Sequence, residues 1–142
     1  MHSTYAFEDF YLTIVHPAMG QLSIQGTGVG SVTYAQANDV SSHDLAADGS
    51  VMTSKIKAGN GTIAISVQQT SDAHAWLTRL YNYLVAAPSK EWAQISSMGV
   101  STTMRTTHVG RNMSFQKRAD KPYQQQGQQV TWTFMAAALE ER

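Results

Sequence analysis

The sequence predicts a mainly β fold, an antiparallel β-sandwich or open barrel of about seven strands with one flanking α-helix. Three observations support this prediction. Apolar and polar residues alternate with period two over most of the chain, which is typical of half-buried strands. Glycine, proline and Asn-Gly or Asp-Gly pairs separate these stretches. Only residues 72–86 combine an apolar stripe at helical spacing with a capping residue and a terminating proline.

The N-terminal part predicts three strands. Residues 10–15 alternate strictly, and a turn with proline and glycine follows at 16–20. Alternation resumes at 21–25. Glycines at positions 26, 28 and 30 then indicate a turn or bulge before a third strand around residues 31–35.

A β-hairpin is predicted over Val51–Gln68. Alternating residues flank Gly59-Asn60-Gly61, a sequence that tolerates the positive φ angles of tight hairpin turns. The preceding residues 38–50 have little periodicity, apart from a turn signal at Asp48-Gly49. We therefore expect a long irregular loop there.

The helix is predicted over Asp72–Ala86. Ser71 or Asp72 can cap its N-terminus, and Pro88 ends it. The apolar stripe that would pack against the sheet consists of Trp76, Leu77, Leu80, Tyr81 and Leu84.

The second half returns to strands. One is predicted over residues 92–100, followed by a Thr-rich stretch at 102–107. The low-complexity residues 124–129 indicate a turn, and residues 136–142 a tail of undefined form. The next strand is predicted to place on one face Val109, Arg111, Met113, Phe115 and Lys117. The last strand is predicted to turn inward Val130, Trp132 and Phe134, with Thr131, Thr133 and Met135 opposite.

The composition fits one domain over residues 1–142, with an N-terminal arm (1–10) and a C-terminal tail (136–142). The absence of cysteine excludes disulfides and thiolate metal sites. Ten basic residues balance ten acidic ones, which disfavours a domain that grips nucleic acid. Charged residues make up 14%, against about 25% in typical proteins, and the polar surface depends on 14 Ser, 14 Thr and 12 Gln. Such a neutral surface is expected of a protein packed against copies of itself.

No targeting or membrane-spanning pattern is visible, so we expect a soluble chain made in the cytoplasm. No catalytic motif is visible either. The five histidines form no His-Glu-x-x-His, and residues 26–30 lack the Gly-Lys-Ser/Thr ending of a phosphate loop. No Gly-x-Ser-x-Gly elbow occurs. We therefore expect no enzymatic activity, cofactor or metal.

One charged cluster, residues 117–121, allows two interpretations. Lys117, Arg118 and Lys121 lie near Tyr123, as in a small nucleic-acid patch. With Asp120 among them, a salt-linked loop or subunit contact is the simpler interpretation, and we favour the contact.

Five stretches in order resemble the tail tube proteins of contractile-tailed bacteriophages, a family similar to type VI secretion tube proteins. The third of them leads into the helix with Leu77 and Leu80-Tyr81-Asn82. The stretches are Tyr5–Asp9, Ala46–Met52, Gly61–Ser71, Phe115–Asp120 and Val130–Phe134.

The resemblance implies a structural role. Six copies would form a ring, with their sheets joined edge to edge, and rings would stack into a hollow tube in the virion tail, assembled in the host cytoplasm. The tube would enclose the tape measure protein and conduct DNA without binding it specifically. Its partners would be the sheath, tail terminator and baseplate proteins. Two alternatives stay open: a tube subunit of a related machine, such as a tail-like bacteriocin or type VI secretion, and a monomeric ligand-binding β-barrel.

The resemblance also implies intersubunit contacts. The 38–50 loop would reach between rings, and both termini would contribute contacts. One face of the 51–68 hairpin and the last strands would line the lumen, which should carry no net positive charge. Lys55 and Lys57 would then pair with Asp44 or Asp48 of an adjacent copy. The predicted contact residues are Asp39, His43, Asp44, Asp48, Lys55, Lys57, Lys117, Arg118 and Asp120.

Overall fold

The computed structural model describes residues 10–25, 29–55, 59–124, 126 and 128–142. The predicted N-terminal arm before Phe10, the 26–28 turn and Lys57 lie outside the described residues.

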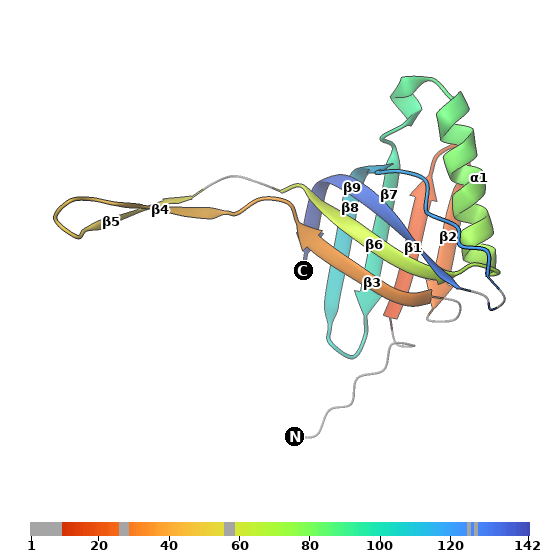
Figure 1. Ribbon diagram of the computed structural model, residues 1–142, viewed down its shortest axis with the longest axis horizontal. Coiled ribbons are helices and arrows are strands. Elements are labelled where there is room, and N and C mark those ends of the chain that lie inside the picture. The colour runs from red at the N-terminus through yellow and green to blue at the C-terminus, as the bar shows by residue number, and fades with distance from the viewer. Residues whose placement is uncertain (1–9, 26–28, 56–58, 125, 127) are drawn as a thin grey trace.

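The fold is a curled antiparallel sheet with one helix, as predicted (Figure 1). Seven strands follow one another across the sheet in the order β2-β1-β7-β8-β9-β6-β3. They are β1 (Phe10–His16), β2 (Gly20–Gln25), β3 (Val29–Gln36), β6 (Gly61–Gln68), β7 (Ile95–Ser101), β8 (Thr106–Phe115) and β9 (Gln129–Glu141). Two further strands, β4 (Ser41–Leu45) and β5 (Val51–Lys55), form a separate hairpin. Helix α1 (Asp72–Ala86) and the short 3-10 turn η2 (Ser89–Glu91) complete the described elements.

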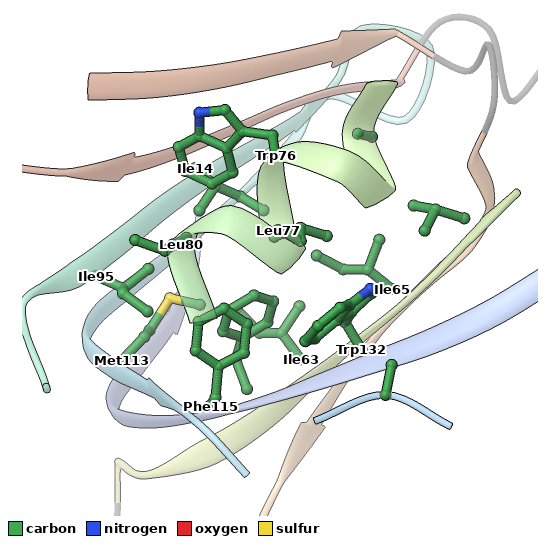
Figure 2. Packing of buried hydrophobic residues seen from close by; sticks show 14 of the residues in the cluster. Ile14, Ile63, Ile65, Trp76, Leu77, Leu80, Ile95, Met113, Phe115 and Trp132 are labelled. Atoms are coloured by element: carbon green, nitrogen blue, oxygen red, sulfur yellow. The ribbon is translucent and has the colours of Figure 1, made fainter. Parts of the chain in front are cut away.

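Helix α1 has the predicted bounds and packs on the concave side of the sheet (Figures 1 and 2). Ser71 caps it by accepting the His74 backbone N–H at 3.2 Å. Leu77 and Leu80 are fully buried. Trp76 and Leu84 are also buried, and Tyr81 packs against the core. The predicted apolar stripe of the helix is therefore confirmed.

The core lies between α1 and the concave face. Alternate residues of each strand point into it, so period-two patterns become one continuous apolar layer (Figure 2). Aromatic rings contact one another edge-on at its centre, with Phe115 at 5.3 Å from Tyr81 and 5.4 Å from Trp132 between ring centroids. The strands contribute Leu12, Ile14, Ile63, Ile65, Val67, Ile95, Met113, Phe115, Val130, Trp132, Phe134 and Ala136.

The predicted hairpin over residues 51–68 is wrong. β5 pairs with β4, and β6 pairs with β3 and β9 instead. Burial explains the difference: Ile63, Ile65 and Val67 need a central position in the sheet to reach the core, whereas the β5 side chains are mostly exposed. The Asn60 carbonyl accepts the Ala37 N–H at 3.1 Å, so this segment extends the pairing of β6 with β3.

The irregular loop predicted over residues 38–50 is likewise wrong in part. Residues 41–45 are strand β4, and only the residues around Asp48-Gly49 turn. Gly49 has φ +89°, and the Asp48 carboxylate accepts both the N–H and the hydroxyl of Ser50, at 3.0 and 2.7 Å. Sequence periodicity missed β4 because both of its faces are exposed.

Three expectations for the C-terminal half also change. The strand expected from residue 92 begins at Ile95, because Trp92 follows η2. Residues 102–105 form a turn, and β8 begins at Thr106. The expected tail, residues 136–142, is mostly strand, since β9 continues to Glu141 and pairs there with β8.

The prediction that residues 109, 111, 113, 115 and 117 share one face is wrong, because β8 contains a bulge. Relative to β7, β8 has one extra residue between Gly110 and Met113, and Asn112 adopts φ +50°. Met113 is therefore buried in the core, whereas Arg111 is exposed on the convex face. Lys117 lies beyond the end of the strand.

We predict that the free energy of unfolding falls in mild acid, because protonation of His74 breaks one buried hydrogen bond. Trp132 donates its indole N–H to His74 Nδ1 at 3.0 Å, which requires a neutral imidazole. Burial, with a smaller contribution from the positive charge of Lys121, lowers the His74 pKa below its ordinary value of 6.5. The stabilisation is therefore complete above about pH 6.5 and is lost progressively as the pH falls below it. Urea midpoints at pH 8.0 and 5.5 measure this loss.

The control is His74→Gln, whose side-chain oxygen can accept the indole N–H but does not titrate. Its midpoint should change less between the two pH values than that of the wild type. An equal change in both proteins would contradict the assignment to His74.

Candidate functional site

The interior leaves little room for a ligand. Tyr34 and His108 lie at the end of the concave face that is farther from α1. Their rings stack with centroids 4.1 Å apart, and the Tyr34 hydroxyl packs over Gly99. Two open hollows of about 210 and 330 Å³ lie beside this pair, near or below the lower end of the range of typical ligand pockets, about 300–1,000 Å³. Burial raises the pKa of Tyr34 far above its ordinary value, so its hydroxyl stays protonated.

The described residues include no group of three or more metal-ligating side chains. Across the same residues, no helix has the length and apolar character needed to span a membrane. The surfaces are therefore the features to examine.

The hairpin of β4 and β5 projects from the body of the domain (Figure 1). The exposed segment 39–55, which forms this hairpin and the two residues before it, contains five of the predicted contact residues: Asp39, His43, Asp44, Asp48 and Lys55. Large apolar side chains are exposed beside them, with Leu45 77%, Val51 54% and Met52 60% accessible.

The register of the hairpin assigns these side chains to two faces. Leu45 lies opposite Val51 on one face, and Asp44 lies opposite Met52 on the other. Both faces thus present apolar groups to solvent. An isolated two-stranded hairpin is at best marginally stable in water, so this one is suited to being covered by another chain.

Asp48 is placed to support the turn at the hairpin tip. The hydroxyl and backbone N–H of Ser50 donate to its carboxylate and lower the pKa of Asp48. The predicted pairing of Lys55 with Asp44 or Asp48 of another copy stays a prediction.

The convex face over β3, β6 and β9 is polar and uncharged along most of its length. Cross-strand rows join Ser31, Ser66 and Thr131, and next to them Thr33, Ala64 and Thr133. None of these three strands contains lysine or arginine. The only acidic residues in them are Glu140 and Glu141, at the end of β9.

The predicted cluster of Lys117, Arg118 and Asp120 divides into two parts. The Lys117 ammonium lies 3.8 Å from the Asp120 carboxylate, and both are exposed. Arg118 turns to α1, where it donates to Asn82 Oδ1 at 2.7 Å and lies 4.5 Å from the Tyr81 ring centroid. Arg118 therefore fastens the β8–β9 connection onto the helix of its own chain, which weakens its assignment as a contact residue.

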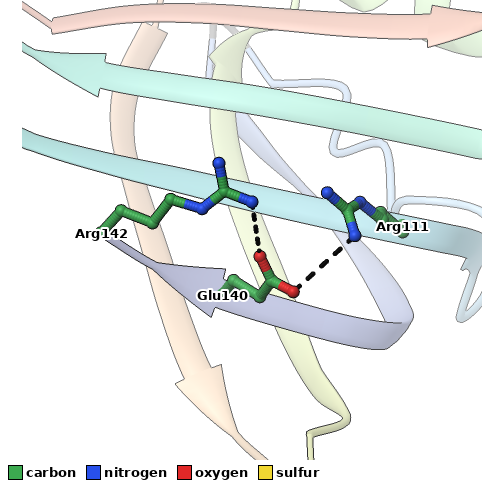
Figure 3. A network of polar contacts seen from close by, with 3 residues as sticks. All are labelled: Arg111, Glu140 and Arg142. Carbon is green, nitrogen blue, oxygen red and sulfur yellow. Dashed lines mark hydrogen bonds and ion pairs between the residues drawn. The ribbon is translucent and has the colours of Figure 1, made fainter.

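Sequence reasoning missed a second charged cluster, at the end of β9. Figure 3 shows Glu140 between Arg111 and Arg142, at 3.7 and 2.9 Å. The signal was hidden because the bulge at Asn112 moves Arg111 out of the simple alternation, and because residues 136–142 were expected to form a tail.

The sheet also keeps two open edges. Among the described strands β2 pairs only with β1, and β3 pairs only with β6. Unpaired strand edges readily add a strand of another chain.

Comparison with known families identifies the class of protein. A family model described as the Bacteriophage PhiTE tail tube protein matches residues 2–142. The chain belongs to this family of phage tail tube proteins. It is therefore a structural subunit of tail tube type, as the five stretches of sequence predicted.

Solved structures of similar fold come from contractile injection machines. The anti-feeding prophage cap, a tube terminating cap, has a chain with TM-score 0.65 at 12% identity, and the match covers 100% of this tail tube protein and 94% of that chain. The sheath/tube terminator of the extracellular contractile injection system PVC gives 0.66 at 8% identity, covering 99% and 98%. Its sheath-tube complex gives 0.62 at 9%, covering 98% and 91%. At these sequence identities the similarity shows that the chains share a fold, and it shows the fold alone. No curated protein sequence matches.

We predict that the tip of the hairpin is needed for assembly and dispensable for folding. The double substitution Leu45→Ser with Val51→Ser should change the free energy of unfolding by less than about 1 kcal/mol, because both side chains are exposed. It should abolish self-assembly. Denaturant unfolding and sedimentation measure the two effects.

The matched comparison is Ile63→Ala in β6, a fully buried position, which should cost about 2–5 kcal/mol. Normal assembly of the double-serine variant would contradict the role of the tip.

Proposed function

We propose that this tail tube protein forms six-membered rings that stack into the hollow tube of a phage tail, which encloses the tape measure protein and conducts DNA. The observation that carries the proposal is the projecting hairpin, whose apolar groups the body of the same chain does not cover. The two open sheet edges support it, because edge-to-edge joining of neighbouring sheets would pair both.

The convex face of β3, β6 and β9 is the proposed lumen wall. It keeps residues 61–68 and the last strand from the expectation, and β3 replaces residues 51–55, which lie in the projecting hairpin. Lysine and arginine bind phosphates by releasing counterions, so a conduit for DNA should avoid them. These three strands have neither, and their outward side chains near the middle of the sheet are Ser, Thr and Ala. We expect Lys117, Asp120 and Lys121 to lie at the margin of this wall, where they line a depression together with Thr131 and Thr133. The positive charge is thus confined to the margin, and the middle of the wall has none.

The proposed partners are the tail sheath, the tail terminator and the baseplate, with assembly in the host cytoplasm. Similarity to chains from sheath-tube, terminator and baseplate assemblies supports these partners. The same similarity favours one alternative, a tube in a related contractile injection machine without a genome to conduct.

Size-exclusion chromatography followed by negative-stain microscopy of the purified chain tests the proposed function. Rings or tubes are expected at high protein concentration. A protein that stays monomeric under all conditions would favour a monomeric barrel and contradict the proposal.

Cysteine labelling tests the proposed lumen wall, because the natural sequence has no cysteine and a single introduced thiol reports on one position. In assembled tubes of the Thr133→Cys variant, a small maleimide should react, whereas a maleimide on a polymer too large for the lumen should not. In the monomer both reagents should react.

The control is Val85→Cys, at an exposed position on α1, which should react with both reagents in either state. Reaction of Thr133→Cys tubes with the large reagent would show that this face is not the lumen wall.

A further inference from the structure

A groove on the convex face of β1, β7 and β8 differs in character from the proposed lumen wall. It has a volume of about 440 Å³ and is lined mainly by apolar atoms. Met98, which lines it, is 51% exposed. Val15 of β1 and Val109 and Arg111 of β8 are among the other lining residues.

The bulge in β8 gives this groove its charged end. Because of the extra residue around Asn112, Arg111 leaves the inward alternation and lies beside the groove with Val109. Glu140 is held more closely by Arg142, at 2.9 Å, than by Arg111, at 3.7 Å. The Arg111 guanidinium has five N–H donors and one 3.7 Å ion pair with Glu140, so it can also bind a second carboxylate.

One face of the β4–β5 hairpin has the complementary arrangement. Met52 and Asp44 are direct cross-strand partners on that face, and both are exposed. Such partners have Cβ atoms about 4.5–5.5 Å apart. Val109 and Arg111 lie two residues apart along β8, a rise of about 6.8 Å, so each surface places an apolar group within about 7 Å of a charge.

The segment around the hairpin is also acidic overall. Residues 38–55 contain Asp39, Asp44 and Asp48 against the single Lys55. The groove end has the opposite balance of side-chain charge, with Arg111 and Arg142 around Glu140. The hairpin projects away from its own sheet and cannot reach the groove of the same chain (Figure 1). The groove that it contacts therefore belongs to a second copy.

We propose that the hairpin of one copy docks on the β1–β7–β8 groove of another, with Met52 in the groove and Asp44 paired with Arg111. The contact rests on the proposed function, since it requires self-assembly, and it names the acceptor surface. It leaves Asp48 as the candidate partner for Lys55. It also leaves the Leu45–Val51 face of the hairpin for a different neighbour.

Disulfide trapping tests the contact, because the natural chain has no cysteine. The Met52→Cys variant is mixed with a tagged Met98→Cys variant under assembly conditions and mildly oxidised. A disulfide between tagged and untagged chains is expected on a non-reducing gel. The matched control is tagged Met135→Cys, since Met135 is 52% exposed on the convex face of β9, outside the groove. Equal or preferential trapping at position 135 would overturn the proposal.

Charge reversal provides a second, independent test. Asp44→Arg and Arg111→Asp should each reduce the number of tubes about tenfold or more, since like charges meet, and the double variant should restore them. Asp39→Arg combined with Arg111→Asp should restore nothing. Wild-type rings without trapping or rescue would overturn this contact alone, whereas a wild-type chain that never assembles would overturn the proposed function and the contact with it.

Discussion

The concave face of the curled sheet must be covered, and the other features of the fold depend on how α1 covers it. Seven strands turn a continuous apolar layer inward, and the sheet stops short of closing, since β2 and β3 do not pair. Leu77, Leu80 and Leu84 of the helix are buried in this layer, and the hydrogen bond from Trp132 to His74 ties the helix to β9. The helix thereby covers the core of one subunit while the sheet keeps two open edges.

This arrangement leaves the outer surfaces of the subunit for contacts with other molecules. The core occupies one end of the concave face, and Tyr34 stacked on His108 occupies much of the other. What remains for other molecules is the open edges, the convex face and the projecting hairpin. In the proposed lumen wall, the absence of lysine and arginine from β3, β6 and β9 removes the cationic groups that bind phosphates by counterion release. Charge concentrates instead on the hairpin, at the end of β9 and in the loop after β8.

Sequence reasoning succeeded wherever burial imposed a period. The helix bounds, its apolar stripe, the strands β1 and β2 with the turn between them, and the inward residues of β9 were all predictable, because burial sets the pattern of each element. It failed where burial imposes none. β4 is exposed on both faces, so nothing in its residues distinguishes a strand from a loop, and β6 was assigned to the wrong partner as a result.

The candidate surfaces were predictable only in part, for the same reason. Residues Asp39 to Lys55 were predicted as contacts from composition and resemblance, and they stay a prediction. Arg111 was not among them, since a single bulge at Asn112 reverses its direction relative to Met113.

Hydrogen–deuterium exchange of the monomer and of the assembled protein shows whether this subunit contacts its neighbours through its outer surfaces. We expect the backbone amides of β4 and β5 to exchange fast in the monomer and to become protected on assembly, together with those at the free edges of β2 and β3. Amides of β8, β9 and α1 should be protected in both states, because they are already paired within one chain. Hairpin amides that exchange equally fast in both states would show that the hairpin is not a contact between copies.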